Sequence, residues 1–203
     1  MPGLLQRTLT LVTLSSLTAM ASAANLYKVE MLVFANQNGI GVNEEYWPDI
    51  APADVSGAVF PRSWDGYPLQ AFEELPRNDL RLSADASRLA RSSGYKVLYH
   101  SGWLQSIGSK SQARPVRIKA STEGYELDGS ISIYRNRFLH AQPSLQLSSH
   151  GSMQQTLSET DSSDRYSPAA WLLQDARRMR SNEIHYIDHP HMGVLLIIRP
   201  VGN

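Results

Sequence analysis

Cysteine is absent from this 203-residue chain. Its absence excludes disulfide bonds, thiolate metal sites, a cysteine nucleophile and an N-terminal lipid carried on cysteine. The chain also lacks an excess of charge of either sign, since it has 19 basic and 19 acidic side chains. Binding to nucleic acid through an overall positive field needs such an excess, so we expect no nucleic-acid partner.

Recognisable catalytic motifs are missing as well. The sequence has no GxSxG elbow, no HExxH motif and no phosphate-binding loop. Catalysis needs a nucleophile beside a base or converging carboxylates, and no such set is evident. We therefore predict a protein that is not an enzyme and that uses no cofactor. Apolar residues make up 42% of the chain, which is enough to fill a hydrophobic core.

The first residues have the three-part pattern of an export signal. Arg7 gives a positive start, an apolar stretch follows, and Ala21-Ser22-Ala23 has the small-x-small form that signal peptidase cleaves. A membrane anchor is the competing interpretation, but threonines and serines interrupt the stretch and leave it too short to cross about 30 Å of hydrocarbon. The sequence predicts a signal peptide over residues 1–23, a secreted protein and no transmembrane anchor.

For residues 24–203 we predict a single antiparallel α+β domain. Alternating apolar residues predict about seven strands, and the spacing in 83–93 predicts one principal helix, capped by Ser83, that packs on the sheet. The expected strands are Leu26–Ala35, Tyr95–Gln105, Pro115–Ala120, Tyr125–Tyr134, Leu145–Leu147, Trp171–Met179, Asn182–Ile187 and Val194–Ile198.

Two long segments show no regular period. Residues 36–78 are rich in proline and glycine and predict a long irregular loop, while the polar residues 150–167 predict a surface loop. The first segment also carries large aromatic side chains whose apolar area must pack on the body of the protein or on a partner. We take Trp47, Trp64 and Tyr67 as candidate partner-binding residues.

The last three expected strands would form an antiparallel meander, with a tight turn at Ser181-Asn182 and a longer turn over Asp188–Gly193. A helix from Ser167 through Arg180 is the alternative, because Ser-Pro can begin a helix. In the longer turn, Asp188, His189, Pro190 and Gly193 are expected to have structural roles, with Asp188 accepting backbone amides and Gly193 supplying an unusual dihedral angle.

The histidines of this turn could also suggest a metal site. His185, Asp188, His189 and His191 offer imidazole and carboxylate ligands that suit zinc. Their spacing is poor for one site, because Pro190 restricts the backbones around it. We expect no metal.

Arginines and aromatic residues gather towards the C-terminus. The guanidinium group binds carboxylates with two parallel hydrogen bonds and stacks on rings, so such a surface suits a ligand with sugar faces and carboxylates. Peptidoglycan is an extracytoplasmic polymer of that kind. The candidate ligand-binding residues are Arg177, Arg178, Arg180, His185, Tyr186, Arg135, Arg137, His140, Trp103 and Gln105.

Five motifs occur in the order of a known family. They are LYKVEMLVFANQ, Trp47-Pro48, YKVLYHSGWLQ, LDGSISIYRNRFLH and RRMRSNEIHYIDHPHMGVLLIIRP. With them the chain resembles the CsiV (cell-shape-integrity) family of periplasmic peptidoglycan-binding proteins from Gram-negative bacteria. The resemblance implies a non-enzymatic periplasmic protein that binds the cell wall and supports its synthesis. It also implies a partner, the outer-membrane lipoprotein activator of a penicillin-binding protein.

Two other functions stay open at this point. The protein could be an envelope adaptor that docks a partner through the aromatic 36–78 segment without touching the wall directly. It could also be a metal-dependent hydrolase centred on the histidines of the last hairpin.

Overall fold

A computed structural model describes residues 25–38, 51–63, 71–149 and 169–202 of the chain. The predicted signal peptide and the 150–167 segment lie outside these residues. The described residues form nine strands and one α-helix, together with two short 3-10 helices. In chain order the elements are β1 (Leu26–Asn36), η2 (Arg77–Asp79), α1 (Ser83–Ala90), β2 (Tyr95–Ser106), η3 (Lys110–Gln112), β3 (Val116–Thr122), β4 (Tyr125–Arg135), β5 (Leu139–Ser149), β6 (Ala169–Gln174), β7 (Arg177–Met179), β8 (Ile184–His189) and β9 (Met192–Pro200).

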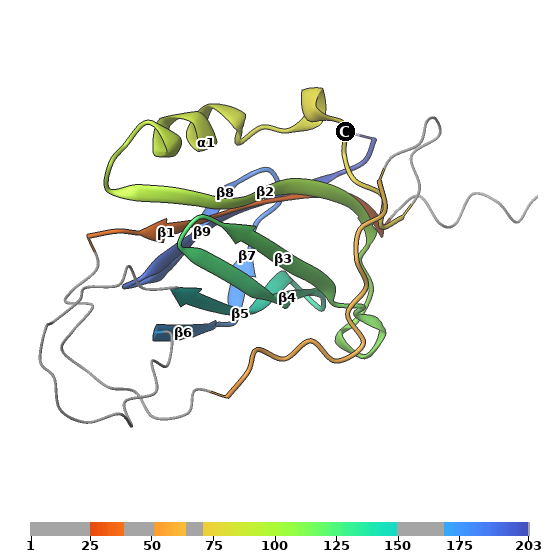
Figure 1. Cartoon of the computed structure of the whole chain (residues 1–203). Helices are drawn as coiled ribbons and strands as arrows, with labels where there is room; N and C mark the ends of the chain where they lie inside the picture. Colours follow the sequence, from red (N-terminus) through yellow and green to blue (C-terminus); the bar gives the residue numbers. More distant parts are fainter. Residues whose placement is uncertain (1–24, 39–50, 64–70, 150–168, 203) are drawn as a thin grey trace, which may run out of the picture.

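The strands form two stacked sheets rather than the one sheet of about seven strands that the sequence suggested. The first sheet has the order β2-β1-β9-β8, and the second has the order β3-β4-β5-β6, with β7 paired to β5. The named strands pair antiparallel throughout. Figure 1 shows α1 on the face of the first sheet that points away from the second, so the molecule has three layers. Mainly antiparallel sheet with one principal helix is thus what the structure shows.

Strand β1 explains why the layers form. Val29, Met31 and Val33 alternate along it and are fully buried between the two sheets. On its other face Leu32 packs with Leu82 and Ile197 in a second apolar cluster, against which the helix lies. Because successive strand residues point to opposite faces, a strand that is apolar on both faces must be covered on both.

The helix is shorter than the predicted 83–93 and ends at Ala90. The predicted cap at Ser83 is wrong, because the N-cap position is Leu82 and no side chain of the helix caps it. Instead the Glu30 carboxylate of β1 accepts the backbone N–H groups of Arg81 (2.6 Å) and Leu82 (2.8 Å). A residue distant in sequence therefore holds the two amides that immediately precede the helix.

Strand β5 covers Leu139–Ser149, so the predicted three-residue strand Leu145–Leu147 was too short. The longer strand contains Pro143, which cannot donate a ladder hydrogen bond. In the structure, the side of β5 that pairs with β6 and β7 has a gap at this position. Strand β6 pairs only with residues 144–149 of β5 and β7 only with 139–141, so Pro143 faces neither of them.

The same gap divides the predicted strand Trp171–Met179 into two. Strands β6 and β7 are separated at Asp175-Ala176, and both pair with β5 in the second sheet. The predicted meander of the last three strands is therefore wrong, because the chain changes sheets between β7 and β8. The tight turn at Ser181-Asn182 is confirmed, and Asn182 there has a φ of 64°. The β8–β9 hairpin is also present.

In the described residues 37–38, 51–63 and 71–78 there is no named strand, and the 3-10 helix η2 begins at Arg77. Two pieces nevertheless lie along sheet edges. Val59 forms a parallel bridge with Val116 at the edge of β3, and Glu74 forms an antiparallel bridge with Trp103 at the edge of β2. Covering an edge in this way removes exposed ladder groups that could pair with another chain.

Candidate ligand-binding surface

The outer face of the second sheet carries a row of polar and aromatic side chains from three strands. Tyr134 of β4 is opposite His140 of β5, which in turn is opposite Arg178 of β7. Leu139 and Met179, their neighbours in register, are buried in the core. Since residues alternate between faces, His140 and Arg178 point away from the core. The rings of Tyr134 and His140 stack with centroids 5.1 Å apart.

The turn between β4 and β5 adds a second aromatic ring at the end of this row. Phe138 is 43% exposed, which is unusual for so apolar a side chain. Two guanidinium groups lie over its ring, that of Arg178 at 4.8 Å and that of Arg137 at 5.5 Å from the ring centroid. Lys110 of η3 lies over the Tyr134 ring in the same manner, at 5.6 Å. We call these six residues the Phe138 surface: Lys110, Tyr134, Arg137, Phe138, His140 and Arg178.

The cations of the Phe138 surface have no acidic partner in the part of the chain that the structure describes. Arginines elsewhere do, for example Arg117 with Asp128 and Arg88 with Asp85. Cation–π contact orients a guanidinium plane on a ring while its N–H edges stay available to an acceptor. The surface is therefore arranged to receive an anion, and bidentate binding of a carboxylate is the contact that guanidinium favours.

Other candidate arginines lie near this surface but are oriented differently. Arg135 is opposite the buried Leu139 and donates a hydrogen bond to the Tyr27 hydroxyl at 2.8 Å, at the end of the sandwich. Arg177 is next to Arg178 in sequence but is opposite the buried Ala141, so it points to the other face of the sheet. The predicted row of neighbouring arginines is thus split between two faces.

The remaining C-terminal candidates belong to other surroundings. Arg180 forms an exposed ion pair with Glu183 at 3.7 Å, and its backbone N–H donates to His185 Nε2 at 3.0 Å. Tyr186 of β8 is in the first sheet, where its ring stacks on Phe34 with centroids 6.3 Å apart. The structure does not bring these three side chains into contact with the Phe138 surface.

Trp103 and Gln105 are not on any surface, which corrects their assignment as a ligand platform. Trp103 is 0% and Gln105 1% exposed. The Trp103 Nε1–H donates to Gln105 Oε1 at 2.9 Å, and Gln105 Nε2 donates to the Arg114 carbonyl oxygen. A buried indole needs a partner for its N–H, and a buried amide on the same strand face supplies it. Their polar ends therefore stabilise the core.

The predicted long turn over Asp188–Gly193 is also wrong, because only Pro190 and His191 lie between the paired ends of β8 and β9. Asp188 accepts the Tyr186 hydroxyl at 2.5 Å and, among the described contacts, no backbone amide. Gly193 is within the ladder and has no positive φ. Glycine is needed there for a steric reason, since a Cβ would lie 2.3 Å from Phe34 Cζ.

The histidines of the hairpin do not converge with an acid. Burial lowers the pKa of His189, as does the neighbouring His191, and burial also lowers the pKa of His191. The His191 ring stacks on Trp171 with centroids 4.1 Å apart, while His185 is engaged by the Arg180 backbone. Within the described ranges no group of three or more histidine, aspartate or glutamate side chains could hold a metal ion.

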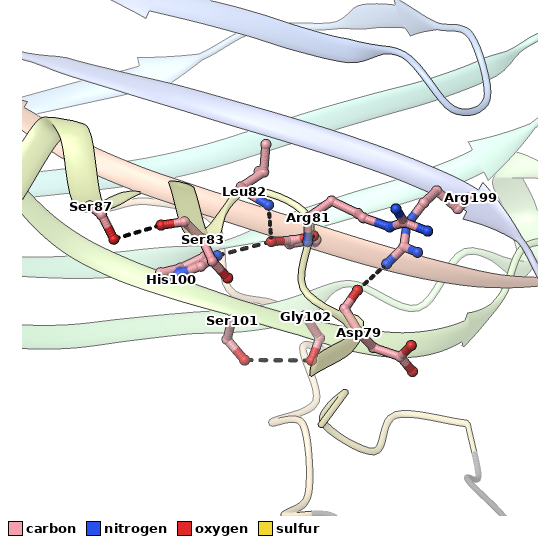
Figure 2. A network of polar contacts seen from close by, with 10 residues as sticks. Asp79, Arg81, Leu82, Ser83, Ser87, His100, Ser101, Gly102 and Arg199 are labelled. Carbon is pink, nitrogen blue, oxygen red and sulfur yellow. Dashed lines mark hydrogen bonds and ion pairs between the residues drawn. The ribbon is translucent and has the colours of Figure 1, made fainter. Parts of the chain in front are cut away.

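A groove of about 620 Å³ lies on the opposite side of the molecule, between α1 and β2. Its lining residues are Glu74, Leu75, Arg77, Leu80, Ser83, Ala86, Ser87, Ala90, Val97, His100 and Ser101. Among them His100 donates from Nε2 to Glu30 at 2.9 Å, and Figure 2 shows the contacts of His100 and Leu82 meeting at one carboxylate. No Phe, Tyr or Trp ring lines this groove, and it carries charges of both signs, so it does not share the chemistry of the Phe138 surface.

The fully buried carboxylate of Glu30 is strongly stabilised in this network. Burial raises the pKa of Glu30, but the hydrogen bonds from His100 and from the backbone of Arg81 and Leu82 outweigh it, so that the pKa is below its ordinary value. Glu30 therefore carries its charge at neutral pH.

Three of the predicted binding residues are not among those that the structure describes. The candidate partner-binding residues Trp47, Trp64 and Tyr67 lie outside the described residues. In the described ranges no helix is long and apolar enough to cross a membrane.

The sequence analysis also left Lys110, Tyr134 and Phe138 out of the candidate site. For Phe138, its position between Arg137 and His140 was the available signal, whereas Lys110 comes from a different segment that only the fold brings near.

The described residues thus define a two-sheet protein with a helix on one face and a cationic, aromatic surface on the other. The family model described as "Peptidoglycan-binding protein, CsiV" matches residues 5–201, and the chain belongs to this family. Neither the comparison with curated proteins nor the comparison with solved structures gave a match.

Proposed function

We propose that this protein is a non-catalytic peptidoglycan-binding protein of the periplasm and that the Phe138 surface contacts the wall. The observation that carries the proposal is the pair of guanidinium groups, Arg137 and Arg178, on one exposed ring with no acidic partner among the described residues. The family description and the anionic character of peptidoglycan support it.

The test is co-sedimentation of the mature protein with purified sacculi at low ionic strength, where charge attraction is least screened. The double variant Arg137→Gln, Arg178→Gln should weaken pelleting by roughly tenfold or more. Each charge-assisted hydrogen bond contributes about 1.5–3 kcal/mol, and 1.4 kcal/mol is a factor of ten. Both side chains are exposed, so the variant should keep its circular dichroism spectrum and melting temperature.

A matched control removes the same charge from the opposite side of the molecule. Arg81→Gln, Arg91→Gln changes two exposed arginines beside α1, and neither side chain has an ion pair within the described ranges. Its pelleting should equal that of the unaltered protein. Equal losses in both double variants would mean that only net charge matters. Failure of the unaltered protein to pellet at low ionic strength would refute wall binding itself.

We further propose that the protein is exported and supports cell-wall synthesis and cell shape together with an outer-membrane lipoprotein activator of a penicillin-binding protein. The export pattern of residues 1–23 and the family resemblance support this proposal. Periplasmic fractionation followed by N-terminal sequencing tests the first part, and the mature chain should begin near Ala24. Cross-linking in cells to the lipoprotein tests the second, and the absence of a cross-linked product would remove the proposed partnership.

A further inference from the structure

The chemistry of the Phe138 surface also indicates which part of peptidoglycan it contacts. Resting on the proposed function, we infer that this surface binds the carboxylates of the stem peptide and not the faces of the sugars. Carbohydrate-binding surfaces commonly use an exposed aromatic face on which a sugar ring lies. Here the aromatic faces already have partners.

Both aromatic rings of the surface have positively charged groups or an imidazole beside them. Arg137 and Arg178 lie over the Phe138 ring, and Lys110 and His140 pack on the Tyr134 ring, which is only 6% exposed. A sugar that approached the Phe138 ring would compete with two guanidinium groups, and one that approached the Tyr134 ring would compete with an ammonium group and an imidazole. The groups left free to meet a ligand are N–H donors, and donors of this charge select anions.

Peptidoglycan offers carboxylates in two places. A stem peptide carries several on successive residues, whereas the lactyl group of the glycan has a free carboxylate only after the peptide has been removed. Each guanidinium carbon lies within 5.5 Å of the same ring centroid, so we infer that one ligand with carboxylates on neighbouring residues reaches both groups. The lactyl carboxylates are one to a disaccharide and do not form such a pair.

The test is an NMR titration of the arginine Nε–Hε signals with the soluble stem tripeptide L-Ala–γ-D-Glu–meso-diaminopimelate. We expect saturable shifts in the signals of Arg137 and Arg178, while that of Arg91 stays unchanged. The same tripeptide with its carboxylates converted to amides should produce at least tenfold weaker binding, because it removes the charge and keeps the shape. The tripeptide should also compete with sacculi in the sedimentation assay.

Glycan strands freed of peptide by an amidase distinguish the two sources of carboxylate. We expect them to bind at least tenfold more weakly than intact muropeptides. Equal or tighter binding of the denuded strands would overturn the inference and leave wall binding intact. Equal shifts from the amidated tripeptide would overturn it as well. If neither intact sacculi nor muropeptides bind, the proposed function fails rather than the choice of ligand.

Discussion

Replacing Glu30 is the perturbation with the largest expected effect on stability. Its carboxylate is 0% exposed and accepts three hydrogen bonds, from the Arg81 and Leu82 amides and from His100. Glu30→Gln keeps the size of the side chain but replaces one acceptor oxygen with a donor. At least one buried N–H then loses its acceptor. Hydrogen bonds to charged groups contribute about 1.5–3 kcal/mol each, so we expect the free energy of unfolding to fall by about 2–4 kcal/mol.

Equilibrium unfolding in urea, followed by circular dichroism, measures this loss. The matched control is Glu123→Gln, because Glu123 is in an exposed turn and has no described contact. It should unfold within about 0.5 kcal/mol of the unaltered protein. If Glu30→Gln also stays within that margin, the network around the start of α1 does not hold the helix, and the reasoning is wrong.

The pH dependence gives an independent check on Glu30. Its folded-state pKa is below the ordinary value of 4.5, because its hydrogen bonds outweigh the effect of burial. The stabilisation is therefore complete above about pH 4.5 and is lost as the pH falls through the lowered pKa. Glu30→Gln has no such group, so its stability deficit should shrink from pH 6 towards pH 3. A deficit that stays constant over this range would show that the carboxylate charge contributes nothing.

Two further substitutions test the core. Gly193→Ala should cost about 1–3 kcal/mol of stability, because the new methyl group would lie on the Phe34 ring; an unchanged melting temperature would contradict this. Trp103→Phe should cost about 2–4 kcal/mol, because it leaves a cavity and an unpaired Gln105 oxygen, yet sacculus pelleting below the melting transition should not change. A selective loss of pelleting in this variant would restore Trp103 as a ligand-binding residue.

The sequence predicted elements where local pattern and burial agree. The alternation in 26–35 located β1, and the apolar stripe with its small residues located α1. It could not predict that two sheets form, because strand pairing depends on contacts between distant segments. Pro143 is an example. A proline can stand in the middle of β5 only because of the gap between β6 and β7, and that gap is formed by another part of the chain.

The candidate site was predicted to a similar degree. Arg137, His140 and Arg178 do lie together, because the β4–β5–β7 register aligns two of them and the turn adds the third. Trp103 was misplaced because residue type alone does not distinguish a buried indole from an exposed one. Neighbours in sequence were also misleading, since Arg177 and Arg178 point to opposite faces of their strand.

The gap between β6 and β7 affects how the sequence of this protein can evolve. Strand β7 is joined to β5 through three residue pairs and is anchored inward by Met179, so it forms a small unit apart from the longer β6 ladder. Mutations on its outward side touch few internal contacts. Side chains at this edge can consequently be exchanged with little effect on folding, so selection can adjust the proposed binding surface and stability separately.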